Sequence, residues 1–106
     1  MASAVIPLFP LPLILLPGEA KPLHIFEERY KKLIRDCRER AGAGQPAEFG
    51  ILFASASGMA SIGTAVQVKR VLKEHTDGRC DVLVEGVRRF RLQQLVCKEV
   101  YDKGEI

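Results

Sequence analysis

The stretch IPLFPLPLILLPGEAKPL, residues 6–23, is almost wholly apolar and carries five prolines. A membrane-spanning helix needs about 20 apolar residues whose backbone N–H groups all bond within the helix, and proline removes that donor repeatedly inside this run. A secretory signal needs basic residues before its apolar segment, and residues 1–10 contain no Lys or Arg. We therefore expect extended chain in a folded domain, with neither a membrane anchor nor a signal peptide.

Proline fixes φ near about −65° and drives the residue before it into extended conformations. Because proline is tolerated at strand starts and edges, the pattern predicts a strand at residues 5–9, a bend, and a second strand at residues 13–16. The Pro17-Gly18 pair predicts a turn after them.

Residues 26–41 carry the most regular pattern in the chain, with apolar side chains at spacings of three and four, which is typical of a helix with one buried stripe. The stripe consists of Phe26, Tyr30, Leu33, Ile34, Cys37 and Ala41. The other face places acids four residues before bases and predicts a solvated surface. These pairs are Glu27 with Lys31, Glu28 with Lys32, and Asp36 with Arg40. Gly42, Gly44 and Pro46 predict the end of the helix.

Strand patterns follow the helix. The apolar run FGILFA, residues 49–54, predicts a buried strand, and the small residues 55–61 predict a loop. Apolar and polar residues alternate at residues 66–71, and Val82 and Val84 lie two apart after a Thr-Asp-Gly-Arg sequence at 76–79. This pattern predicts a β-hairpin at residues 69–85.

Beyond this hairpin, Gly86 predicts a bulge or a close backbone approach. The following VRRFRL places Phe90 and Leu92 on one face of a strand, with Arg89 and Arg91 on the other. About six short strands and one long helix indicate a mainly β (α+β) fold: a small antiparallel β-barrel whose opening the helix covers. The 106 residues suit a single domain, residues 1–106.

The cysteine and histidine positions predict no metal site and no disulfide. Three cysteines without a CxxC pair indicate reduced thiols and a cytoplasmic protein. They are Cys37, Cys80 and Cys97. His24 and His75 stand apart from them, so zinc-ligand spacing is absent. We expect no cofactor.

Motifs for catalysis are also missing. Ser55, Ser57 and Ser61 cluster without a GxSxG motif or a marked partner base, so a mobile loop is the favoured interpretation. The sequence AGAGQP, residues 41–46, follows a helix and lacks the Lys-Ser/Thr ending of a P-loop, so it offers no phosphate cradle.

Four segments of the chain resemble the N-terminal (LON) domain of Lon proteases and of small stand-alone LON-like proteins. They are IPLFPLPLILLPGEAKPLHIFEERY, FGILF, IGTAVQV and DGRCDVLVEGVRRFRL, in an order and spacing that fit the family from about Val5 to Leu95. The resemblance implies a PUA-like β-barrel with one packed helix, and a role in recognising substrates or partners for proteolysis. The ATPase and Ser-Lys peptidase modules of Lon have no counterpart here, so the resemblance implies a protein that is not an enzyme.

The chain departs from the family pattern in two ways. The loop between FGILF and IGTAV is short, and the sequence stops at VYDKGEI, where another strand is expected. We therefore expect only the N-terminal β subdomain, without the helical half that usually follows, either as a fragment of a longer protein or as a naturally short form. A truncated barrel would leave a strand edge open to pairing with a second copy of the chain.

Two functions follow as hypotheses. The first is a non-catalytic module that binds unfolded or tagged polypeptide, or a protease or ATPase partner, through exposed apolar surface. Leu11, Leu13 and Leu15 are its candidate contacts, with burial in the core as the competing interpretation. The alternative is RNA binding through the face of Arg89 and Arg91, for which pairing with acids such as Glu85 is the competing interpretation. The mild net charge of +3 and the absence of Trp disfavour RNA.

Overall fold

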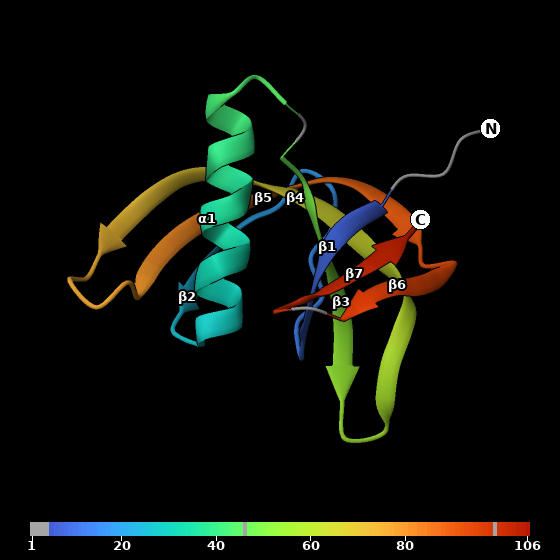
Figure 1. The fold of residues 1–106 in the computed structure, drawn as a ribbon. Coiled ribbons are helices and arrows are strands. Elements are labelled where there is room, and N and C mark those ends of the chain that lie inside the picture. The colour runs from blue at the N-terminus through green and yellow to red at the C-terminus, as the bar shows by residue number, and fades with distance from the viewer. Residues whose placement is uncertain (1–4, 46, 99) are drawn as a thin grey trace.

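The computed structural model describes residues 5–45, 47–98 and 100–106. In these residues one curled seven-stranded sheet lies against a single helix (Figure 1). The elements are β1 (Val5–Leu11), β2 (Ala20–Ile25), α1 (Glu28–Gly42), β3 (Phe49–Ser55), β4 (Gly58–Glu74), β5 (Cys80–Arg91), β6 (Gln94–Lys98) and β7 (Asp102–Glu105). The prediction of a mainly β fold with one long helix is confirmed.

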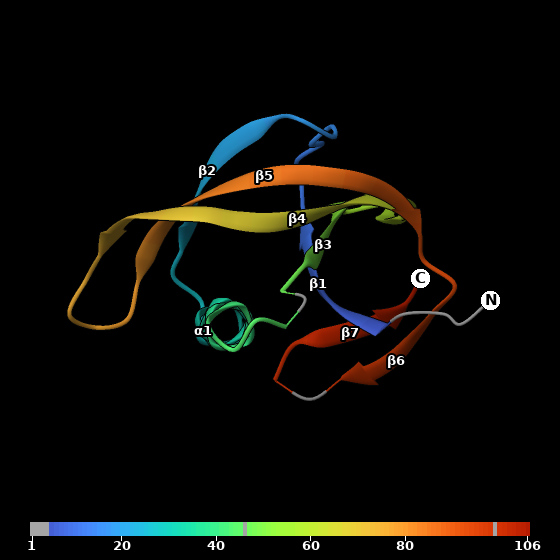
Figure 2. The ribbon, with the colours of Figure 1, turned by 90° about the horizontal axis from the view of Figure 1, so that it is seen from above.

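The predicted antiparallel barrel of about six strands is wrong. The strand order is β2-β5-β4-β3-β1-β7-β6, and β1 pairs with β3 in parallel. A parallel pair needs a long crossover connection, which β2 and α1 supply here. The sheet curls so that β1, β7 and β6 lie across from β2, β5 and β4 (Figure 2). Within the described residues no ladder joins β2 to β6, so the sheet stays open.

The proline-rich stretch forms one strand and a loop. The first predicted strand is confirmed as β1, but residues 13–16 form no strand, and the second strand of the region is β2, which pairs with β5. Between them, residues 12–19 form a segment that we call the proline loop. Its predicted turn is confirmed, because the amide of Glu19 donates to the carbonyl of Leu16 at 3.0 Å and Gly18 adopts φ +85°.

The helix α1 forms where the sequence predicts it and buries the four central residues of the stripe, which are Tyr30, Leu33, Ile34 and Cys37. Phe26 lies before the helix and is 58% exposed, contrary to the prediction. The predicted acid–base pairs are also wrong. Lys31 bonds Glu28, and Lys32 bonds Asp36. The face is nonetheless charged and largely exposed, as expected.

Both ends of β4 are hairpins. The predicted loop at residues 55–61 is instead a tight turn that pairs Ser55 with Gly58, whose φ of +131° suits glycine. Residues 58–61 of the predicted loop belong to β4, but these small residues lack the apolar alternation that predicts a strand. The other hairpin, between β4 and β5, is confirmed, with Gly78 at φ +92° in the turn.

Two buried clusters lie on opposite faces of β3, because alternate side chains of a strand point to opposite sides. Phe49 and Ile51 belong to the first cluster with Phe9 and the buried stripe of α1. Leu52 belongs to the second, with Ile6, Leu8, Ala65 and Phe90. The predicted outward position of Arg89 and Arg91 and inward position of Phe90 are confirmed.

Candidate functional site

The proline loop and the far end of the β3–β4 hairpin enclose a hollow of about 280 Å³, which we call the apolar groove. Its lining consists of Leu13, Ile14, Leu15, Ile51, Phe53, Ala60, Ile62, Gly63, Thr64 and Arg89. Nine of these ten residues carry no charge, and no acidic side chain is among them. The groove therefore combines an apolar wall with a single cation.

Hydrogen bonds hold the proline loop against the sheet. Thr64, which is 3% exposed, donates through Oγ1 to the carbonyl of Leu15 at 2.5 Å. The amide of Gly18 donates to the carbonyl of Gly86, and the amide of Gly86 donates to the carbonyl of Glu19, both at 2.9 Å. The loop wall of the groove is thus fixed before any ligand arrives, which lowers the entropy cost of binding.

Three large apolar side chains of the groove are open to solvent. Ile14 is 62% exposed, Ile62 is 40% exposed and Phe53 is 39% exposed. Exposed apolar surface of this kind, gathered around a hollow, marks binding sites for proteins and ligands. None of these three residues was a candidate from the sequence. The segment that carries Phe53 and Ile62 was predicted as a strand followed by a loop, and not as the β3–β4 hairpin.

The three leucines that the sequence singled out have different environments. Leu13 is half-buried and lines the groove, and Leu15 also lines it but is only 2% exposed, so it forms the floor as part of the core. Leu11 is half-buried against the first cluster and is not part of the lining. The structure thus brings Leu13 and Leu15 together and separates Leu11 from them.

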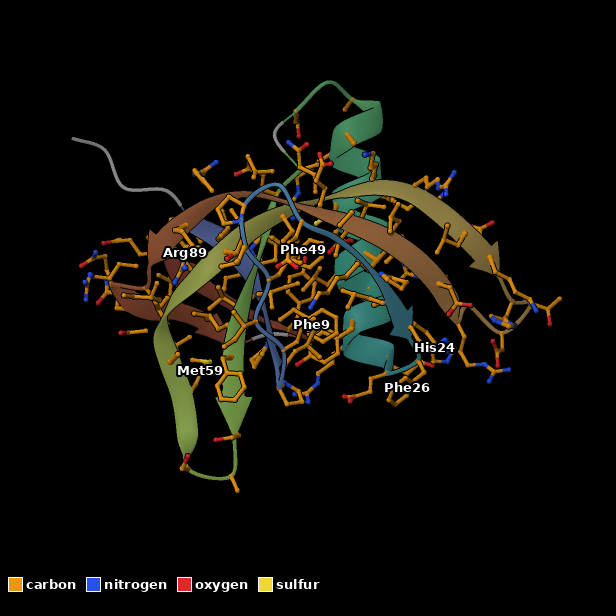
Figure 3. The ribbon with its side chains drawn as sticks, turned by 180° about the vertical axis from the view of Figure 1, so that it is seen from behind. Phe9, His24, Phe26, Phe49, Met59 and Arg89 are labelled. Atoms are coloured by element: carbon orange, nitrogen blue, oxygen red, sulfur yellow. The ribbon has the colours of Figure 1, made fainter. Side chains whose placement is uncertain are left out.

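Arg89 and Arg91 are exposed on one face of β5, in register with Thr64 and Ile62 of β4. Arg89 lines the groove and Arg91 does not. Among the described residues neither makes an ion pair, and Glu85, the partner considered from the sequence, binds Lys69 at 3.1 Å instead. Figure 3 shows Arg89 on the same side of the molecule as Met59 of the β3–β4 hairpin.

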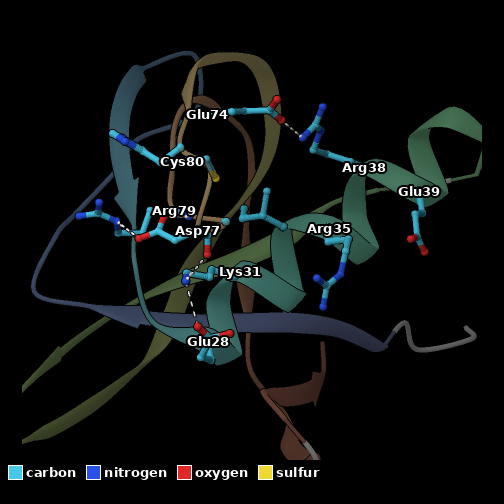
Figure 4. Close-up of a pocket in the computed structure, with 12 residues that line it drawn as sticks. Glu28, Lys31, Arg35, Arg38, Glu39, Glu74, Asp77, Arg79 and Cys80 are labelled. Atoms are coloured by element: carbon cyan, nitrogen blue, oxygen red, sulfur yellow. Dashed lines mark hydrogen bonds and ion pairs between the residues drawn. The ribbon is translucent and has the colours of Figure 1, made fainter.

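A second, larger hollow of about 560 Å³ lies between α1 and the β4–β5 turn (Figure 4). Its charges are largely compensated. Arg38 binds Glu74 at 2.6 Å, Arg79 binds Asp77 at 2.8 Å, and Lys31 reaches both Glu28 and the backbone carbonyl of Asp77. Two of these bonds, Arg38 with Glu74 and Lys31 with the carbonyl of Asp77, join the helix to the β4–β5 hairpin, so we interpret this hollow as a structural junction.

The two cysteines whose side chains are described are buried and free. Burial raises the pKa of the Cys37 thiol to about 11 and also raises the pKa of Cys80. Both thiols are therefore protonated near neutral pH and poor nucleophiles. Within the described ranges, no three His, Cys, Asp or Glu side chains are grouped as a metal site would require. In the same ranges, no helix has the length and hydropathy to cross a membrane.

Comparison with known proteins gives one consistent family. Residues 5–106 match the family described as the ATP-dependent protease La (LON) substrate-binding domain. The Lon protease of Porphyromonas gingivalis is 30% identical over 97 residues, which span 89% of this chain and 11% of that protease.

Solved structures agree with this assignment. A Lon N-terminal domain protein from Xanthomonas campestris superposes with a TM-score of 0.77 at 34% identity, covering 95% of this chain and 57% of that one. The N-terminal domain of the Mycobacterium avium complex Lon protease shares the fold, with a TM-score of 0.71 at 16% identity, 95% of this chain and 52% of that one being covered. The chain thus spans little more than half of these solved domains. On this evidence it belongs to the LON substrate-binding domain family.

Proposed function

We propose that this chain is a non-catalytic module that binds unfolded polypeptide for proteolysis, and that the apolar groove is the binding surface. The observation that supports the proposal is the exposure of Ile14, Phe53 and Ile62 around a hollow whose loop wall is fixed by hydrogen bonds. An unfolded segment exposes apolar side chains that a folded protein buries, and burying them here would supply the binding free energy.

The family supports the same role, since the matched residues correspond to a substrate-binding domain and not to an ATPase or peptidase. A protease or ATPase that would receive the bound polypeptide is part of the proposal. RNA binding receives less support, because Arg89 lies beside apolar residues at the groove and a mild net charge of +3 supplies little attraction for phosphates.

The test is fluorescence anisotropy of a labelled, unstructured peptide with a central run of Leu, Ile and Phe, titrated with the chain at low and at high salt. We expect salt-tolerant binding, and we expect Ile14→Ser and Ile62→Ser each to weaken it by about fivefold, the loss of about 1 kcal/mol of apolar contact.

Leu72→Ser is the matched control, because Leu72 is 45% exposed on β4 but lies outside the groove lining. Equal weakening by all three substitutions would place the binding surface elsewhere. A labelled single-stranded RNA in a parallel titration distinguishes the alternative, since binding that falls steeply with salt would favour nucleic acid.

A further inference from the structure

Arg89 is the single charged residue in the lining of the apolar groove. The guanidinium group is always protonated and offers several N–H donors in one plane, a geometry that fits a carboxylate. Among the described residues no carboxylate is paired with it, whereas its neighbour Arg88 is paired with Glu48 at 2.5 Å. The donors of Arg89 are therefore available to a ligand.

The position of Arg89 on β5 follows from the register of the sheet. It pairs with Thr64, and Arg88 pairs with Ala65, so the two arginines point to opposite faces. Arg89 shares its face with Thr64, which bonds the proline loop and also lines the groove. A polypeptide lying in the groove would thus meet apolar side chains and one cation together.

We propose that the groove selects polypeptide segments in which an acidic residue flanks an apolar run, with Arg89 binding the carboxylate. This inference rests on the proposed function and names the class of substrate that the same site takes. A basic residue at the flanking position meets like charge without a compensating acid in the lining, so it is disfavoured.

The test uses three labelled peptides that share one central apolar run and differ at a single flanking residue, which is Glu, Gln or Lys. Anisotropy titrations at low salt with the 106-residue chain should rank them Glu, then Gln, then Lys. We expect Glu to exceed Gln by about threefold to fivefold, the range that a partly exposed ion pair supplies. High salt should reduce the difference between Glu and Gln.

Arg89→Gln should bring the Glu and Gln peptides to equal affinity. Two matched variants control for charge alone. Arg91→Gln removes a charge from the same face outside the lining, and Arg70→Gln removes one from a distant part of β4. Both should keep most of the preference for Glu. Because Arg89 is exposed, the fold should persist, and a melting curve of Arg89→Gln checks this.

The outcomes separate the two proposals. If all three peptides bind equally well to the unmodified chain, the charge preference is wrong, while the proposed binding of polypeptide stands. If the preference for Glu survives in Arg89→Gln, another residue reads the carboxylate and the inference is also wrong. If no peptide binds, the proposed function itself fails.

Discussion

Single residues with unusual constraints explain much of the packing. Gly50 and Gly63 flank the ring of Phe90 so closely that an added Cβ would lie 2.6 Å and 2.8 Å from its Cζ. Two glycines on neighbouring strands therefore leave a slot that one aromatic ring fills. The need for glycine at these positions is a packing constraint, since neither adopts a positive φ.

Phe90→Ala should lower the free energy of unfolding by about 3 to 5 kcal/mol, because the ring is 8% exposed and its loss leaves a cavity beside the two glycines. Arg89→Ala, one residue away and exposed, should change it by less than about 0.5 kcal/mol. Urea denaturation followed by circular dichroism measures both. The reverse order would mean that the register of β5 is shifted by one residue.

Cys37 should make the protein lose stability in alkali. Its thiol is buried, and the pKa rises from 9.0 to about 11 on folding because burial disfavours the thiolate. The buried, protonated thiol stabilises the fold fully at pH values below the pKa of the unfolded state. This stabilisation is lost progressively as the pH rises through the pKa of the folded state. Between about pH 9 and about pH 11, ionisation of Cys37 should lower the free energy of unfolding by up to about 2 to 3 kcal/mol.

Melting temperatures across this range measure the effect, and Cys37→Ala should have the shallower decline. Tyr101 and Tyr30, whose pKa values burial also raises, remain in both proteins, so the comparison isolates the thiol. Parallel declines of the two proteins would show that Cys37 does not titrate as proposed.

At the scale of secondary-structure elements, a bulge in β5 determines which of the two buried clusters each of its inward side chains joins. Gly86 pairs with Val66 and Arg88 pairs with the adjacent Ala65, so Val87 is extra. Val84 and Phe90, an even number of residues apart, therefore lie in different clusters. The backbone of the same Gly86 forms hydrogen bonds with the proline loop, so this residue connects the bulge to the loop wall of the groove.

Gly86→Ala should disturb the contact between the proline loop and β5. An added Cβ would lie 2.4 Å from the carbonyl oxygen of Leu16, and the backbone must move to relieve the contact. We expect a loss of about 1 to 3 kcal/mol in the free energy of unfolding, together with weaker binding of the apolar peptide.

Gly42→Ala is the control for that substitution, because nothing lies within 4 Å of its added Cβ and its φ is not positive. It should be neutral or slightly stabilising. If Gly86→Ala melts at the same temperature as Gly42→Ala, the loop does not pack against β5 as described.

At the scale of the whole molecule, the open sheet ends in two edge strands, β2 and β6. Pro22 and Lys21 blunt the edge of β2, since proline and lysine disfavour pairing with another chain. The strand β6 instead presents Leu95 and Val96, which are 41% and 51% exposed. Self-association through a strand edge, expected from the sequence, is therefore predicted at β6.

Sedimentation velocity over a concentration series measures this association. Val96→Lys should shift the protein toward the monomer, because a charge on an edge strand opposes pairing. Val100→Lys is the control, since Val100 is 47% exposed but outside β6. A sedimentation coefficient independent of concentration would rule out this contact.

Local patterns in the sequence determined the helix, the strands β1 and β3, the β4–β5 hairpin and the alternation of Phe90 with its arginines. Each depends on short-range periodicity or turn chemistry that neighbouring residues supply. Only the tertiary structure decided the parallel pairing of β1 with β3, the open sheet and the groove. The groove joins Ile14, Ile62 and Arg89, residues far apart in the chain that the sheet order and a bulge bring together. From the sequence, Leu13 was a candidate for polypeptide binding and Arg89 a candidate for RNA binding. Their proximity in one groove was not predictable, because pairing between distant strands leaves no short-range signal.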